Sequence, residues 1–251
     1  MRFSSPTTRF LLPLFAVALL PLAAGAQELP TAKALMDKHN AALGGKAMLD
    51  KYTSMQMTAK LTIAAMGMEA TLETYRAKPN LYLQKTIIAQ IGEVLQGYDG
   101  KVAWGSNPMG GAQILEGEAL ESAARNADFF ANFQDPTSFT LSETVELADF
   151  EGRKCYKVKV AHGDRVGAEY FDAGTGLLAG FSGETPGPQG KIETTTIFAE
   201  YADFGGVKMP RRIEQRTPQG DVSIVFTAVE FDKVDPAVFT LPAAVKALIK
   251  P

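Results

Sequence analysis

The 251-residue sequence has few side chains whose type and spacing suggest covalent or metal chemistry. Two histidines, His39 and His162, and one cysteine, Cys155, are too few to build a zinc site, an iron–sulfur cluster or a disulfide framework. No second histidine, cysteine or acidic cluster lies near His39 in the sequence, and we interpret it as a helix residue close to the surface. We interpret Cys155 as a small strand residue. We therefore predict neither a metal site nor a cofactor.

Two motifs match enzyme signatures only in part. Ser182 lies in Gly-Phe-Ser-Gly-Glu, which begins like the nucleophile elbow of a hydrolase but has Glu184 where the last glycine is required. Residues 174–180 (GTGLLAG) place the third glycine one position too late for a dinucleotide-binding loop. A glycine-rich hairpin turn accounts better for that segment. A Ser–His–Asp arrangement stays open as an alternative, because its members need not be close in sequence, but we predict that the protein is not an enzyme.

The composition is that of a folded globular protein, with 46% hydrophobic and 21% charged residues. The formal net charge is −3, and nucleic-acid binding requires concentrated Lys and Arg side chains. We therefore expect no nucleic-acid partner.

The N-terminal residues have the pattern of an export signal. Arg2 and Arg9 precede an apolar run at 10–24, and Ala-Gly-Ala at 24–26 offers the small residues that a signal peptidase recognises. The alternative is a membrane anchor, but a run of 15 residues interrupted by two prolines is too short to span a bilayer. We predict a signal peptide at 1–26, cleavage before Gln27 and a periplasmic location. No cysteine follows the run, so we expect no lipid anchor.

The remaining residues, 27–251, have to position any functional group, and their periodicity predicts mainly strands. A first helix is expected at 31–43, with Thr31 as its N-cap and two glycines after it. From residue 55 the period changes to two, and apolar and polar residues alternate as in a strand with one buried face. The apolar positions of this strand are Met55, Met57, Ala59, Leu61 and Ile63.

Further runs of this kind, separated by turn residues, continue to residue 231. The dipeptide Asp99-Gly100 marks a tight hairpin, and a second helix is expected at 118–133, with aromatic residues at its end. No alternation of strands and helices appears, which argues against a parallel sheet of the Rossmann type. We predict a mainly β (α+β) single domain at 27–251. It is a curved antiparallel sheet of about ten to eleven strands that forms an unclosed half-barrel, with helices covering its concave face.

Several segments in order resemble the periplasmic lipoprotein-carrier superfamily, the LolA/LolB-like group of outer membrane lipoprotein-sorting proteins. The resemblance spans nearly the whole chain after the signal peptide, although each motif is short. The segments are 75–82 (YRAKPNLY), 98–108 (YDGKVAWGSNP), 170–172 (YFD) with 175–178 (TGLL), Tyr201 with 205–210 (GGVKMP), and 235–242 (DPAVFTLP).

This resemblance implies an unclosed β-barrel whose apolar cavity accepts acyl chains. Methionine suits such a cavity because its flexible thioether adapts to variable chains. Apolar residues that alternate on a strand can equally form a filled core. Arg76 can orient a polar head group or lie at a solvated strand end, and both interpretations stay open. The residues that we expect to line the cavity or its lid are Met55, Met57, Leu61, Ile63, Arg76, Leu83, Trp104, Phe129, Phe130 and Phe133.

The leading hypothesis is a soluble carrier that binds acyl chains of a lipoprotein or lipid and moves them across the bacterial envelope. It would receive its cargo from an inner-membrane donor, deliver it to an outer-membrane acceptor and act as a monomer. The alternatives are an envelope interaction or assembly module that uses the same fold with a filled core and, third, a hydrolase.

Overall fold

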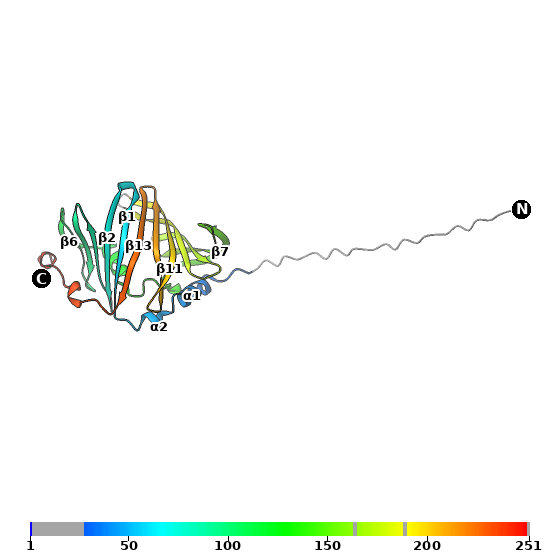
Figure 1. The fold of residues 1–251 in the computed structure, drawn as a ribbon, viewed down its shortest axis with the longest axis horizontal. Coiled ribbons are helices and arrows are strands. Elements are labelled where there is room, and N and C mark those ends of the chain that lie inside the picture. The colour runs from blue at the N-terminus through cyan, green and yellow to red at the C-terminus, as the bar shows by residue number, and fades with distance from the viewer. Residues whose placement is uncertain (2–27, 163–164, 188–189, 250–251) are drawn as a thin grey trace.

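The computed structural model describes residue 1 and residues 28–162, 165–187 and 190–249. The signal peptide and cleavage site expected from the sequence lie outside the described residues, as do parts of the turns expected at 162–164 and 185–190. Within the described part, the chain forms one antiparallel sheet of 13 strands (Figure 1). The prediction of ten to eleven strands was too low. One short strand, β6, escaped recognition because its five residues include only two large apolar side chains.

The strands follow one another in space almost as they do in sequence. Two meanders, β1 to β6 and β7 to β13, join where β1 pairs with β13. The sheet is not closed, because β6 and β7 lie at its two ends. The strands are β1 (Ser54–Ile63), β2 (Met68–Ala77), β3 (Leu81–Ile88), β4 (Gly92–Tyr98), β5 (Ala103–Asn107), β6 (Gly111–Leu115), β7 (Leu141–Phe150), β8 (Arg153–His162), β9 (Arg165–Asp172), β10 (Leu178–Gly187), β11 (Gly190–Phe204), β12 (Val207–Thr217) and β13 (Gly220–Phe231).

Four α-helices and three 3₁₀ turns are present among the described residues. Thr31 caps α1 as expected, since its hydroxyl oxygen accepts a hydrogen bond from the Ala34 amide at 3.2 Å. The second predicted helix, α3, ends at Ala127 instead of Phe133. The Asp128 carboxylate accepts the Phe130 amide at 2.9 Å, which favours a turn over another helical residue. The elements are α1 (Ala32–Ala42), α2 (Lys46–Leu49), α3 (Gly117–Ala127), α4 (Ala243–Lys246), η1 (Ala64–Met66), η2 (Pro136–Ser138) and η3 (Pro236–Phe239).

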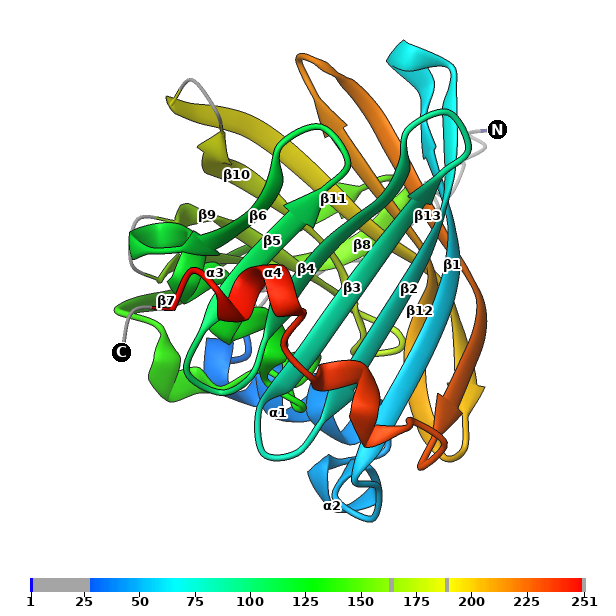
Figure 2. The same cartoon turned by 90° about the vertical axis from the view of Figure 1, so that its left-hand side faces the viewer.

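The two faces of the sheet carry different elements. We call the face with Met55 and Met57 the inner face and the opposite one the outer face. Helix α1 packs its Leu35 and Met36 against Phe171 and other inner-face residues of β8 to β10. Helix α3 lies against β3, β4 and β5, whereas α4 packs on the outer face of the same region. Figure 2 shows α3 and α4 on opposite sides of these strands.

Candidate ligand-binding face

Strand β1 changes from a packed to a partly open environment along its length. Met55, Met57 and Ala59 are buried, with exposed fractions of 1%, 5% and 2%. Leu61 and Ile63, which point to the same face, are half-buried. The inner face of β1 is therefore covered at its start and partly exposed to solvent towards its end.

The neighbouring strands continue this half-buried apolar surface. In the β1–β13 ladder Leu61 pairs with Ile224 and Ile63 with Val222, and paired residues of an antiparallel ladder share a face. Ile224 in turn pairs with Ile213 of β12. These strands lie between the part of the sheet that α1 covers and the part that α3 covers. We call this surface the inner apolar strip, and it consists of Leu61, Ile63, Ile213, Val222, Ile224 and Phe226.

At the other end of β1 the inner face is filled by a hydrophobic cluster. Met55 and Met57 pack there with Phe129 and Phe133, and Phe130 packs at the edge. The structure thus brings five of the predicted site residues together in a core. The same cluster contains Leu43, which follows α1, Leu49 of α2, and Leu177, Val207 and Met209.

Residues 128–134, which we call the cover segment, link this cluster to α1. Asn40 of α1 donates its amide to the Gln134 carbonyl at 2.7 Å, and its side-chain oxygen accepts the Gln134 amide at 2.8 Å. The Lys78 ammonium lies 5.4 Å from the ring centre of Phe129 and 5.5 Å from that of Phe130. Lys78 also forms an ion pair with Asp50 at 2.6 Å. The cover segment is therefore held from the helix side and from the sheet side.

His39 supplies a third link, which sequence reasoning missed. It is 2% exposed, its Nδ1 accepts the Leu178 amide at 3.0 Å, and it also hydrogen-bonds to the backbone of Asn132. Burial lowers the pKa of His39 to about 4, so that the ring is neutral at pH 7. The expectation of a surface position was wrong, although His39 does belong to the apolar stripe of its helix. Its partner Leu178 is too distant in sequence for any local signal to reveal it.

Leu83 and Trp104 lie on the other side of the sheet. Both are buried, with exposed fractions of 4% and 3%, in an outer-face cluster with Tyr75 and with Val245 of α4. The strand alternation agrees with this position. Tyr75 precedes the inner-face residue Arg76 in β2 and therefore points to the outer face. Leu83 pairs with Tyr75 and so shares that face. The thickness of the sheet separates these two residues from the inner apolar strip.

Arg76 points to the inner face, where it pairs with Met55 of β1 and Tyr82 of β3. Its Nε atom is buried and has no hydrogen-bond partner among the described residues. Burial lowers the pKa of Arg76, and the charges of Tyr82 and Asp128 act in the opposite direction. The residue is half-buried, which argues against the interpretation as a solvated strand end.

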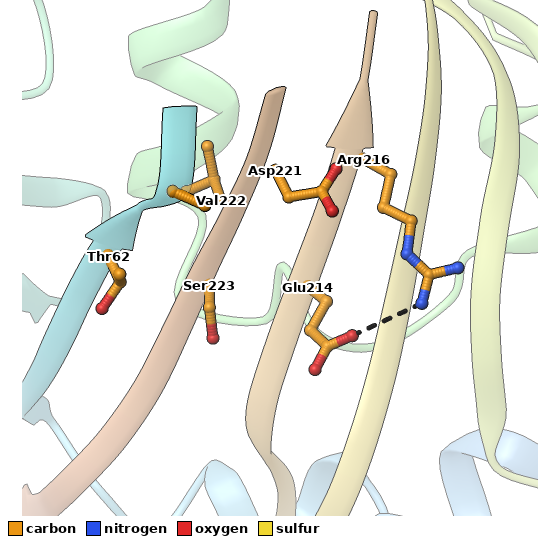
Figure 3. A pocket seen from close by; sticks show the side chains of 7 residues that line it. Thr62, Glu214, Arg216, Asp221, Val222 and Ser223 are labelled. Atoms are coloured by element: carbon orange, nitrogen blue, oxygen red, sulfur yellow. Dashed lines mark ion pairs between the residues drawn. The ribbon is translucent and has the colours of Figure 1, made fainter. Parts of the chain in front are cut away.

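A small pocket of about 230 Å³ lies at the ends of β1, β12 and β13, where Val222 of the strip is one of its lining residues. Thr62, Ser223 and Glu214 pair across these strands on the outer face. Figure 3 shows Arg216 next to Glu214, and the two form an ion pair at 3.7 Å. Arg216 also contacts Glu151 at 2.9 Å. The charge of Arg216 is thus balanced by Glu214 and Glu151, and this side chain is not free to bind a ligand in the pocket.

The described residues contain no group of three or more His, Cys, Asp and Glu side chains that could hold a metal ion. Cys155 is buried on the outer face, in a cluster that also contains Phe150 and Tyr170. Burial raises the pKa of its thiol to about 11, which keeps the thiol protonated at pH 7. In the part of the chain that the structure describes, no helix has the length and apolarity needed to cross a membrane.

Comparisons with solved structures identify the fold. A DUF1329 family protein from Desulfovibrio piger superposes with a TM-score of 0.61 at 13% identity, over 85% of this chain and 98% of that one. A LolA superfamily protein from Nitrosomonas europaea superposes with a TM-score of 0.56 at 11% identity, over 85% and 99%. The chain therefore has the LolA-like fold that the sequence motifs predicted. No family model matches the sequence, and no curated protein is significantly similar to it.

Proposed function

We propose that this protein is a carrier that binds acyl chains on the inner apolar strip and shields them from water. The observation that carries the proposal is the half-buried apolar surface in the middle of the inner face, between α1 and α3. An apolar surface of this kind is costly in water unless a partner covers it. Each CH₂ group buried there contributes about 0.8 kcal/mol, so a single acyl chain supplies substantial affinity.

The proposed setting is the bacterial envelope. A signal peptide at 1–26 exports one domain, 27–251, to the periplasm, where a carrier has to move lipid through water. The cargo is a lipid or the acyl chains of a lipoprotein, taken from an inner-membrane donor and passed to an outer-membrane acceptor. Binding and release require no chemical step and no cofactor. The LolA-like fold supports a carrier kind of function.

One observation favours a second candidate, an interaction or assembly module with a filled interior. Met55, Met57, Phe129 and Phe133 are all buried in one cluster, so this half of the inner face has no room for a ligand as it stands. The two candidates make opposite predictions for lipid uptake. A carrier acquires lipid on its inner face, and a module with a filled core does not.

A pair of variants on β13 tests the carrier. Ile224 lies in the strip, whereas Val225 is its neighbour, is also half-buried and points to the outer face. We expect Ile224→Asp to weaken lipid binding about tenfold or more, because a carboxylate must then be desolvated against the acyl chain. We expect Val225→Asp to keep the affinity of the original protein.

The measurement is native mass spectrometry of the purified protein after incubation with envelope lipid extract. Adducts in the mass range of lipids that disappear after organic extraction support the carrier. An unliganded mass throughout contradicts it and favours the interaction module. Equal loss of adducts in both variants shows that the inner apolar strip is not the binding surface.

A further inference from the structure

The Arg76 side chain is a cation that lies beside Met55 on the inner face, and its Nε has no partner among the described residues. The fold satisfies a second partly buried arginine, Arg153, with two backbone carbonyls, those of Phe198 at 3.2 Å and Ala179 at 3.0 Å. The side chain of Arg76 forms no ion pair and no hydrogen bond with the described residues, and its Nε is buried. An N–H donor withdrawn from water without a partner is destabilising, and the Nε of Arg76 is such a donor. Its presence on the inner face calls for an explanation other than stability.

The groups around Arg76 leave its donors available. Tyr82, its neighbour on β3, donates its hydroxyl proton to Gln84 Oε1 at 2.6 Å. Asp128 of the cover segment acts on Arg76 through its charge but forms no ion pair with it. The Asp128 carboxylate instead accepts the Phe130 amide. An incoming anion would therefore meet a free guanidinium and one weak competitor.

The distance from Arg76 to the strip matches the length of a lipid. Arg76 lies at the level of Met55, six residues before Leu61 along β1. At about 3.4 Å per residue this is about 20 Å along the strand. One leaflet of a bilayer, headgroup included, is also about 20 Å thick. A lipid with its headgroup at Arg76 thus reaches the inner apolar strip with its chain once the cover segment, whose Phe129 and Phe133 pack on Met55 and Met57, has moved aside.

We propose that Arg76 recognises the anionic headgroup, a phosphate or a carboxylate, of the amphiphile whose chains occupy the inner apolar strip. The inference rests on the proposed function and adds the class of cargo. Guanidinium groups bind these anions with two parallel hydrogen bonds, a geometry that a neutral headgroup does not offer. The cover segment lies over this end of the face, so the headgroup enters as residues 128–134 move aside.

Two amphiphiles with the same chain test the proposal: dodecyl phosphate and uncharged 1-dodecylglycerol. We expect the protein to bind dodecyl phosphate about tenfold or more tightly than dodecylglycerol in calorimetric titrations. Arg76→Gln should remove this preference and leave the affinity for dodecylglycerol unchanged, which also shows that the variant is folded. Asp128→Asn should strengthen dodecyl phosphate binding roughly threefold, because it removes the competing carboxylate.

The outcomes separate this inference from the proposed function. Equal affinities for the two amphiphiles in the original protein overturn the role of Arg76 and leave the carrier intact. Absence of binding to either amphiphile overturns the carrier itself. Inorganic phosphate is titrated as well. If it binds as tightly as dodecyl phosphate and the Arg76→Gln variant loses this affinity, then Arg76 binds a free anion and the proposal of a lipid headgroup is overturned.

Discussion

At the scale of single residues, His39 couples folding to pH. Its pKa in the folded protein, about 4, lies below the ordinary value of 6.5, so the unfolded chain binds the proton more tightly. The contribution of His39 to the free energy of unfolding is therefore complete above pH 6.5 and is lost as the pH falls through 4. We expect the free energy of unfolding to fall by about 3 kcal/mol over this range from His39 alone. Urea unfolding at a series of pH values measures it.

His39→Gln provides the control for this prediction. A glutamine amide can accept the Leu178 amide and donate to Asn132, yet it does not titrate. Hydrogen bonds from Thr175 and Thr53 help to lower the pKa values of Asp172 and Asp232. Protonation of these two carboxylates in acid also destabilises the fold, but it does so equally in the original protein and in the variant. The difference between the two pH profiles therefore isolates His39. Parallel profiles would show that the ring does not titrate in this way.

The residue scale is where sequence reasoning reached least far. Leu61 and Ile63 could be placed on one face because strand alternation is a local property, and the structure agrees. We predicted Leu83 and Trp104 on the same face as these two residues, and the structure places them on the opposite one. Sequence alternation shows that two residues of one strand share a face, but it does not show which face of the sheet that is. That depends on pairing register and on the C-terminal segment, which reaches back to pack against β3 to β6.

At the scale of elements, the C-terminal segment closes the outer face. Val245 of α4 is fully buried against the cluster of Tyr75, Leu83 and Trp104, whereas its neighbour Lys246 is exposed. Trp104 is the only tryptophan in the sequence, so its fluorescence reports on this contact. We expect Val245→Asp to release α4, to shift the emission of Trp104 to longer wavelength and to raise its quenching by acrylamide.

Lys246→Asp changes the charge on the same helix without touching the cluster, and its emission should equal that of the original protein. Since α4 lies on the outer face, lipid binding on the inner apolar strip should survive in both variants. Unchanged emission in Val245→Asp would mean that the segment does not cover Trp104 in solution. Elements whose partners are adjacent in sequence, such as the hairpin at Asp99, were predictable; this distant contact was not.

At the scale of the whole molecule, the sheet is one continuous surface with two free ends. The sequence favoured a meander because consecutive strands are joined by short turns, and the midway helix marked the interruption. The β1–β13 pairing that joins both halves links residues at opposite ends of the chain, such as Met55 and Phe231, and no local pattern specifies it. The inner apolar strip spans this junction. The site is therefore a property of the assembled sheet and not of any one segment.

An open sheet also has edges that could pair with a second copy. Edge strand β7 exposes Glu143 and Glu146, and antiparallel pairing of two β7 strands about residues 144 and 145 would place Glu143 of each copy opposite Glu146 of the other. Like charges in such positions are unfavourable, and charged edges are a common protection against association. We therefore expect the protein to be a monomer, and the double variant Glu143→Thr, Glu146→Thr to dimerise.

Analytical ultracentrifugation over a range of protein concentrations measures this difference. Replacing Glu116 and Glu118, exposed acidic residues outside the strands, by Thr removes the same charge away from the edge and controls for net charge. That control should remain monomeric. A dimer already present in the original protein would contradict the argument, because the carboxylates of β7 would then fail to prevent pairing of two edge strands. If the protein is a monomer, both ends of the sheet stay unpaired and the inner face stays open to a lipid.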